Sequence, residues 1–165
     1  MTQTRRSATL LALTPLASLM ALTGCGPDSG NIQVDVTFPA SMSAEALDGR
    51  LVLVLSARDE GEPRFHVTDG PAAQPVFGID VDGWAPGEAA TFTDTVFGFP
   101  VGDLGALPPG TYRAQALLNR YETFNRSDGH TVKLPPDRGE GQQWARKPGN
   151  LYSEPVDFTV GAGGG

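Results

Sequence analysis

Cysteine, histidine and catalytic motifs are scarce in this sequence. Cys25 is the single cysteine among 165 residues, so the chain cannot form an internal disulfide. There are two histidines, and no G-x-S-x-G elbow, H-E-x-x-H pair or Walker A loop is present. No motif therefore places a nucleophile, a zinc ion or a nucleotide, and we expect no catalytic residue and no cofactor in this chain.

Long apolar runs are also missing, apart from one near the N-terminus. Residues 10–22 are mostly apolar and follow Arg5 and Arg6. The run is shorter than the roughly 20 residues that a membrane-spanning helix needs, and its layout is typical of a secretory signal. The residues that end it, Leu22-Thr23-Gly24-Cys25, resemble a bacterial lipobox. The resemblance implies cleavage after Gly24 and acylation of Cys25, and several acyl chains give a stable membrane anchor.

This resemblance also implies a location. Residues 1–24 would be a lipoprotein signal peptide and 25–30 a lipidated tether, with the membrane as a partner through Cys25. The protein would lie in the cell envelope, on the outer membrane or on the periplasmic face of the inner membrane of a Gram-negative cell. An ordinary secreted protein with a free thiol is the alternative.

Basic residues are outnumbered by acidic ones. The chain has 12 Lys and Arg against 19 Asp and Glu, for a net charge of −7, which disfavours nucleic acid as a partner. Residues 120–155 differ from the rest, since they hold 6 basic and 5 acidic residues. The basic residues therefore gather in the last third of the sequence.

Alternating apolar and polar residues predict strands throughout the mature chain. The predicted strands are 31–38, 50–57, 64–67, 75–83, 90–99, 111–121, 130–134 and 154–160. No helical periodicity follows Cys25, and 50–57 is apolar enough for a central strand buried on both faces. We predict an all-β domain over 31–160, an antiparallel immunoglobulin-like β-sandwich of seven to eight strands. Residues 161–165 would be a Gly-rich tail or a cut linker.

Few residues outside the basic third could bear chemistry. His66 lies among apolar neighbours, and we interpret it as a structural histidine with a satisfied hydrogen bond. Asp80, Asp82 and Glu88 form a weak candidate calcium site, because Trp84 occupies a position where an EF-hand loop needs a ligand. The alternative is a strand that ends in an Asp-Gly turn, with Trp84 covering the core.

The stretch from residue 121 to 155 is the most unusual part of the sequence. Residues 135–153 show no strand or helix pattern, and loops of that length are usually functional or disordered. Aromatic residues and arginine together are typical of contact surfaces. The alternative is a long loop packed on its own tryptophan. The candidate interaction surface comprises Tyr121, Phe124, Arg126, His130, Arg138, Trp144, Arg146, Lys147 and Tyr152.

Several segments together resemble one known group of proteins. They are DGRLVLVLS, EPRF, VFGIDVDGWAPGE, LPPGTYRAQALLNRYETFNRSDGHTVKLPPDRGEGQQW and KPGNLYSEP. They are similar to the region that precedes the catalytic domain in bacterial esterases related to enterochelin-esterase-like hydrolases, over roughly Asp48 to Val160. The resemblance implies a non-catalytic accessory β-sandwich that contacts a hydrolase domain beyond Gly165 or another envelope protein, and it carries over no catalytic residue.

A carbohydrate- or small-ligand-binding module is the alternative function. Trp84, Tyr121, Trp144 and Tyr152 could form a stacking platform for sugar rings if the fold brought them onto one exposed surface.

Overall fold

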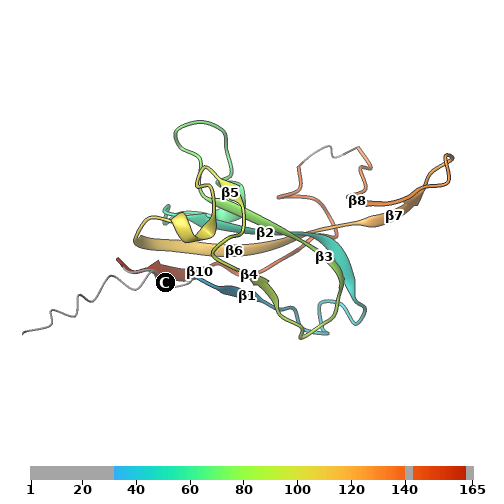
Figure 1. Ribbon diagram of the computed structural model, residues 1–165, viewed down its shortest axis with the longest axis horizontal. Coiled ribbons are helices and arrows are strands. Elements are labelled where there is room, and N and C mark those ends of the chain that lie inside the picture. Colours follow the sequence, from blue (N-terminus) through green and yellow to red (C-terminus); the bar gives the residue numbers. More distant parts are fainter. Residues whose placement is uncertain (1–31, 140–142, 163–165) are drawn as a thin grey trace, which may run out of the picture.

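The computed structural model describes residues 32–139 and 143–162, and this part of the chain is all-β (Figure 1). It contains ten strands, two 3-10 turns and no α-helix. The strands are β1 Val34–Val36, β2 Leu47–Ser56, β3 Val76–Trp84, β4 Ala90–Phe92, β5 Gly98–Phe99, β6 Gly110–Arg120, β7 Glu122–Asn125, β8 Thr131–Leu134, β9 Leu151–Tyr152 and β10 Val156–Val160, and the turns are η1 Pro63–Phe65 and η2 Leu104–Ala106. The predicted all-β class is confirmed.

The largest of the three sheets, called the larger sheet here, has six strands. Five of them follow the order β10-β6-β2-β3-β5, and the sixth, β9, also pairs with β6. All its pairs are antiparallel, and the central strand β2 places Leu51 opposite Leu118 on β6 and Ile79 on β3. Neighbouring β2 residues Leu53 and Val54 point to opposite faces of the sheet, and both are buried. The prediction that this run is a central strand buried on both faces is therefore confirmed.

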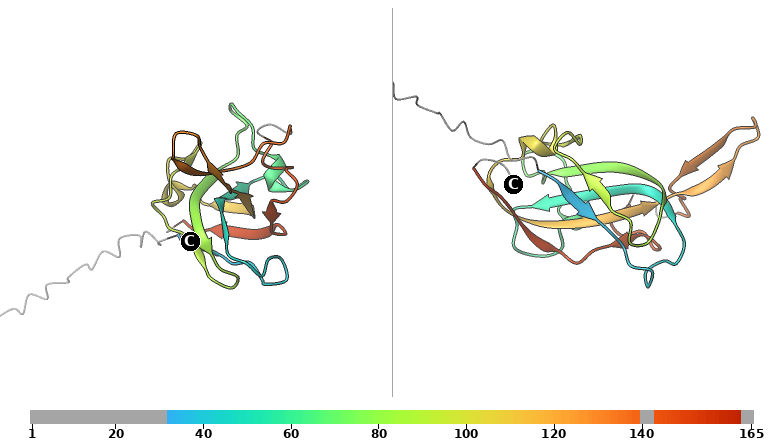
Figure 2. Two further views of the ribbon diagram at one scale, coloured as in Figure 1. Left: turned by 90° about the vertical axis from the view of Figure 1, so that its right-hand side faces the viewer. Right: turned by 60° about the horizontal axis from the view of Figure 1, so that its bottom comes forward.

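A second, two-stranded sheet of β1 and β4 covers one face of the larger sheet (Figure 2). Phe92 of β4 is fully buried in the core between the layers, where Trp84 packs edge-on against Phe38 with ring centroids 4.7 Å apart. Burial of each such aromatic ring contributes about 1.5–3 kcal/mol relative to its exposure. The layers are thus unequal, with two strands facing six, and Trp84 covers the core as expected.

The opposite side of the larger sheet is called the back face here. Val54, Gln115 and Leu117 on this face are buried almost completely. The 3-10 turn η1 lies against β2 and β6 and covers part of it. The back face therefore supports a second packed layer made of turns rather than strands.

The third sheet is the β7–β8 hairpin, which continues from β6 and extends away from the body (Figure 1). Nearly all of its residues are exposed, which distinguishes it from the other strands. Lys133 of β8 joins it to the body through ion pairs with Asp48 at 2.7 Å and Asp82 at 2.6 Å. The hairpin is therefore held at its base by charge rather than by apolar packing.

Several predicted strand bounds are wrong. Residues 64–67 do not form a strand, because η1 and the turn after it occupy this region. The predicted strand 90–99 is divided into β4 and β5, whereas β7 and β9 lie where no strand was predicted. These differences account for ten strands in place of seven to eight. The predicted signal peptide 1–24, the tether 25–30 and most of the tail 161–165 lie outside the described residues.

Candidate functional site

Arginine and aromatic side chains alternate in a row that includes Arg64 and Phe65 of η1. The guanidinium carbon of Arg64 is 3.7 Å from the ring centroid of Tyr152 and 4.4 Å from that of Phe65. The guanidinium carbon of Arg146 also lies 4.4 Å from the Phe65 ring. Arginine over an aromatic face is attracted by the ring quadrupole, so these contacts order four side chains from three segments of the chain. The row comprises Tyr152, Arg64, Phe65 and Arg146.

Arg64 is fixed by its own hydrogen bonds. Its Nε and Nη2 donate to the Glu62 carboxylate at 2.8 and 3.1 Å, and its Nη1 donates to the carbonyl of Ala145 at 3.0 Å. Such a bidentate pair is stronger and more directional than a single ion pair. The hydrogen bonds with Arg64 lower the pKa of Glu62 below its ordinary value, and the Glu62 carboxylate raises the pKa of Arg64. Both groups therefore stay charged over the physiological range.

Gln115 connects this row to the back face of the sheet. Its buried amide oxygen accepts from the Arg64 backbone N–H at 3.0 Å. Its Nε2 donates to Glu62 and to the Ser153 carbonyl, each at 2.8 Å. A buried amide with every polar atom satisfied fixes the geometry of its partners. The position of Arg64 is thus set from the interior of the fold.

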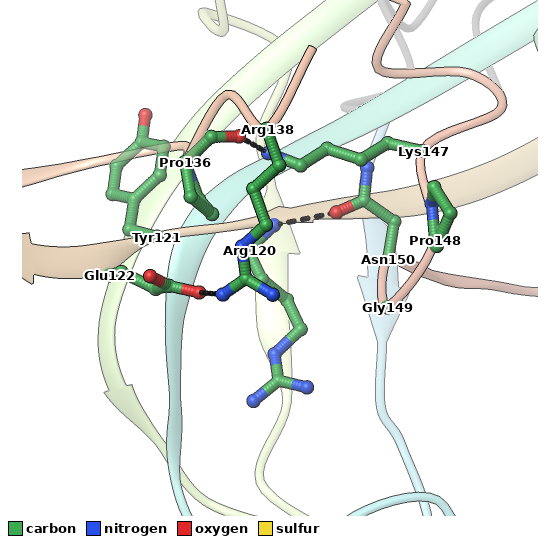
Figure 3. A pocket seen from close by; sticks show the side chains of 9 residues that line it. All are labelled: Arg120, Tyr121, Glu122, Pro136, Arg138, Lys147, Pro148, Gly149 and Asn150. Atoms are coloured by element: carbon green, nitrogen blue, oxygen red, sulfur yellow. Dashed lines mark hydrogen bonds and ion pairs between the residues drawn. The ribbon is translucent and has the colours of Figure 1, made fainter. Parts of the chain in front are cut away.

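A cavity of about 380 Å³ lies next to the row, where β6 ends (Figure 3). Inside it, Arg138 pairs with Glu122 at 2.7 Å, and the Lys147 ammonium donates to the Pro136 carbonyl. Its lining residues are Arg120, Tyr121, Glu122, Pro136, Arg138, Lys147, Pro148, Gly149 and Asn150. Four of these residues, 147–150, also line a second hollow that contains the row. The cavity and the row therefore form one surface on two sides of segment 147–150.

Asn150 holds that shared segment against the sheet. Its Oδ1 accepts from the Arg120 backbone N–H at 3.1 Å, and its Nδ2 donates to the Trp144 carbonyl at 2.9 Å. After it, β9 pairs with β6, so that Tyr152 lies opposite Leu117. Residues 143–153 are therefore tied to β6 by both side-chain and strand hydrogen bonds, although the sequence shows no pattern there.

We call this surface the arginine–aromatic face. It comprises Arg64, Phe65, Arg120, Arg138, Arg146, Lys147 and Tyr152. Among residues 32–139 and 143–162, the guanidinium groups of Arg120 and Arg146 have no ion-pair partner. Two exposed cations without carboxylates, one of which lies over the Phe65 ring, can accept an acidic group from outside the chain.

The structure brings together five of the nine predicted surface residues. Tyr121, Arg138, Lys147, Arg146 and Tyr152 line the cavity or the second hollow. The others lie apart from it: Phe124, Arg126 and His130 are on the β7–β8 hairpin, and Trp144 lines neither hollow.

No pattern in the sequence indicated that Arg64, Phe65 and Arg120 belong to this surface. The first two lie far away in the chain, in a segment predicted as a strand. Pro63 before them is the available signal, because proline favours the first position of a turn.

The four rings of the possible sugar platform do not line one hollow. Trp84 is 5 % exposed and belongs to the core, and Trp144 is half-buried outside both hollows. Tyr121 lines the cavity, whereas Tyr152 lines the second hollow on the other side of segment 147–150. Trp84 and Tyr152 both line a third, mostly apolar hollow, but no hollow in the described part of the chain is lined by all four rings.

The candidate calcium ligands have other partners. Asp80 accepts from Tyr121 Oη at 3.1 Å and pairs with Arg50 at 3.3 Å, while Asp82 pairs with Lys133. Glu88 accepts from the Ala85 N–H within its own turn. In the described part of the chain, no three His, Cys, Asp or Glu side chains are placed to hold a metal ion.

Ser56 and His66 form the one contact in the described residues that resembles a nucleophile and its base. Ser56 Oγ lies 2.8 Å from His66 Nδ1 and accepts from the Arg58 N–H at 3.2 Å. The serine is fully buried, so its oxygen cannot reach a substrate in this conformation. Burial lowers the pKa of His66, and the charge of Arg58 lowers it further. The contact gives His66 the hydrogen-bond partner that its interpretation as a satisfied histidine requires.

Comparison with known proteins finds no matching family model, no matching curated protein and no matching solved structure. The fold and the site define an all-β protein of unequal antiparallel layers that carries a basic, aromatic surface. Over residues 32–139 and 143–162, no helix is long and apolar enough to cross a membrane.

Proposed function

We propose that this protein is a lipid-anchored envelope protein whose β-domain is a non-catalytic interaction module. The arginine–aromatic face contacts its partner, and the acylated Cys25 holds the module at the membrane. The observation that carries this proposal is the row of Tyr152, Arg64, Phe65 and Arg146, fixed from the interior by Gln115. Arginine and aromatic side chains on rigid backbone are typical of interface hot spots, because little entropy is lost when they bind.

The partner that fits this face is an acidic segment of another protein or domain. Arg120 and Arg146 are exposed and lack ion-pair partners in the described structure, so a carboxylate from outside would meet little competition. The chain has a net charge of −7, so the rest of its surface repels acidic partners. Attraction of an acidic partner is therefore restricted to this face. The resemblance to esterase accessory regions makes a hydrolase domain the first partner to test.

Photocrosslinking in cells tests the proposal. A photoreactive phenylalanine analogue at Phe65 should give one discrete crosslinked partner, because this ring lies in the row. The matched control carries the analogue at Phe124, another exposed ring, which lies on the hairpin. Arg146→Glu should abolish the crosslink from position 65 without changing the melting temperature. A crosslink that persists in Arg146→Glu would contradict binding through this face.

Ester hydrolysis tests the non-catalytic part. The purified chain should not hydrolyse p-nitrophenyl esters, because Ser56 is buried behind His66. Hydrolysis that Ser56→Ala removes would assign catalysis to this pair and overturn the proposal.

A further inference from the structure

Two exposed aromatic side chains lie outside the arginine–aromatic face. Phe97 is 77 % exposed and Phe99 is 57 % exposed. Gly98 between them is buried, and a Cβ there would lie only 2.3 Å from Cδ1 of the Phe77 ring. Because successive residues of an extended chain point to opposite sides, Phe97 and Phe99 both point to the side of the sheet opposite to the Phe77 ring, away from the core.

The segment that carries these rings is uncharged and ordered. Residues 95–102 contain no ionisable side chain. The Gly98 N–H donates to the Gly102 carbonyl at 3.2 Å, and the Leu104 N–H donates to the Val96 carbonyl at 3.1 Å. Two rings held in water by an ordered backbone form an apolar contact site rather than a loose loop.

Strand register places this segment at the end of the domain where the described chain begins. Phe99 pairs with Val76, the first residue of β3. Val34 pairs with Phe92 in an antiparallel pair, so the residues that precede Val34 and the residues that follow Phe92 leave this pair at the same end. Figures 1 and 2 show the start of β1, the end of β10 and η2 together at this end, with the β7–β8 hairpin at the other.

The chain length before Ile32 limits how far this end can lie from an acylated Cys25. Six residues, 26–31, separate the two. Extended chain spans about 3.3–3.6 Å per residue, so the distance is at most about 25 Å. An acylated Cys25 would therefore keep Phe97 and Phe99 close to the bilayer surface.

We propose that Phe97 and Phe99 insert into the interface of the bilayer that holds the acylated Cys25. This inference rests on the lipid anchor of the proposed function. Apolar rings transferred from water into the acyl boundary stabilise the contact, and a tethered domain loses little further freedom when it makes it. The domain then rests on the membrane at this end. The Arg120 side of its arginine–aromatic face lies at the other end of β6 and stays accessible to a partner.

The charge of the chain decides which lipids matter. The full sequence has a net charge of −7, and the acylated chain would be more acidic still, because Arg5 and Arg6 would leave with residues 1–24. An acidic domain is repelled by anionic head groups, so the contact depends on apolar insertion and not on lipid charge. We expect insertion in vesicles of zwitterionic phosphatidylcholine, with no gain from anionic lipid.

Single-cysteine labelling tests the inference on the full, acylated chain. Acylation consumes the thiol of Cys25, so Phe97→Cys introduces the only free thiol, to which an environment-sensitive fluorophore is attached. In phosphatidylcholine vesicles its emission should shift to the blue, and brominated lipids should quench it. Phe124→Cys, an exposed ring on the hairpin, is the matched control and should show neither effect. Thr95→Cys keeps both rings and gives a second position within the uncharged segment.

The outcomes separate the two proposals. One outcome would overturn membrane insertion but leave the anchor intact. In it, the acylated protein binds vesicles, yet the labels at 95 and 97 are as exposed to water as the label at 124. Protein that takes up no fatty acid and stays in solution would overturn both. Blue-shifted, quenched labels at 95 and 97, with an unchanged label at 124, would support the inference.

Discussion

Gln115 donates a 2.8 Å hydrogen bond from its buried amide to the carboxylate of Glu62, fifty-three residues earlier in the chain. The same carboxylate holds the Arg64 guanidinium, so one interior amide sets the place of a cation in the row. A contact surface on turns would otherwise be mobile, because turns have few backbone hydrogen bonds of their own. This bond is the reason that the arginine–aromatic face can be rigid.

Replacing this amide should therefore cost stability. Gln115→Leu keeps the side-chain volume but leaves the Arg64 N–H and the Ser153 carbonyl without their partner. Unpaired buried groups cost about 1–3 kcal/mol, so the free energy of unfolding should fall by about that amount. Denaturant unfolding measures it. Gln33→Leu, at an exposed glutamine, is the control and should change stability by no more than about 0.5 kcal/mol. If Gln115→Leu and Gln33→Leu lowered the free energy of unfolding by the same small amount, the proposed role of Gln115 in holding Arg64 would be contradicted.

Arg64 and Arg146 should separate stability from binding. Arg64 is mostly buried and bonded to Glu62, so Arg64→Ala should lower the free energy of unfolding by about 1.5–3 kcal/mol. Arg146 is exposed, its guanidinium lies over the Phe65 ring, and it forms no ion pair in the described structure, so Arg146→Ala should leave stability within about 0.5 kcal/mol. Partner crosslinking from position 65 should weaken in both variants. A large loss of stability in Arg146→Ala would show that the row is mainly structural.

Most strands that the sequence predicts well have one-sided or complete burial, and the exposed strand β8, predicted as 130–134, is the exception. The strands β2, β3, β6 and β10 lie close to the predicted ranges, because burial against the core creates the alternation that is visible in the sequence. The strands β7 and β8 form a hairpin exposed on both sides, so burial gives β7 no pattern. The strand β9 has two residues and exists because it pairs with Leu117 and Leu118.

The site was predictable only where its residues are near in sequence. Arg138, Arg146 and Lys147 are gathered by composition alone. Arg64 comes from a segment about eighty residues away, and its place depends on hydrogen bonds to Gln115 and Ala145. Long-range hydrogen bonds of this kind leave no local signature, so no reading of composition could place Arg64 over Tyr152.

Stability should fall as the pH drops below the ordinary pKa of histidine. Burial, Arg58 and Arg113 lower the pKa of His66 from 6.5, so the unfolded chain takes up the proton at a higher pH than the folded one. The stability that neutral His66 provides is therefore complete above pH 6.5 and is lost as the pH falls. Unfolding measured between about pH 7.5 and 5.5 should show this loss, since most carboxylates stay ionised there.

The other histidine is the control for this effect. His66→Gln should make the free energy of unfolding less dependent on pH over that range, because the shifted group is gone. His130 is exposed at the hairpin tip. His130→Gln should therefore leave the free energy of unfolding as dependent on pH as it is in the wild type. A pH dependence that survives in His66→Gln would assign it to other groups.

The hairpin should loosen independently of the body. Lys133 forms ion pairs with Asp48 and Asp82, and these pairs raise the pKa of the lysine and lower that of Asp48. Lys133→Met removes both pairs but keeps the apolar stem, so amide exchange in β7 and β8 should become faster while exchange in β2 stays the same. Added salt should act on the wild type in the same direction, because exposed ion pairs are screened.

A pair at the hairpin tip provides the matched control. Arg126 pairs with Asp128 within the turn and does not reach the body, so Arg126→Met should leave exchange at the base of the hairpin unchanged. Exchange that is equally fast in both variants would mean that any lost charge loosens the hairpin. Exchange that Lys133→Met leaves unchanged would mean that Tyr121, bonded to Asp80, is sufficient to hold it. Ion pairs that hold the base of the hairpin require amide exchange there to be faster in Lys133→Met and unchanged in Arg126→Met.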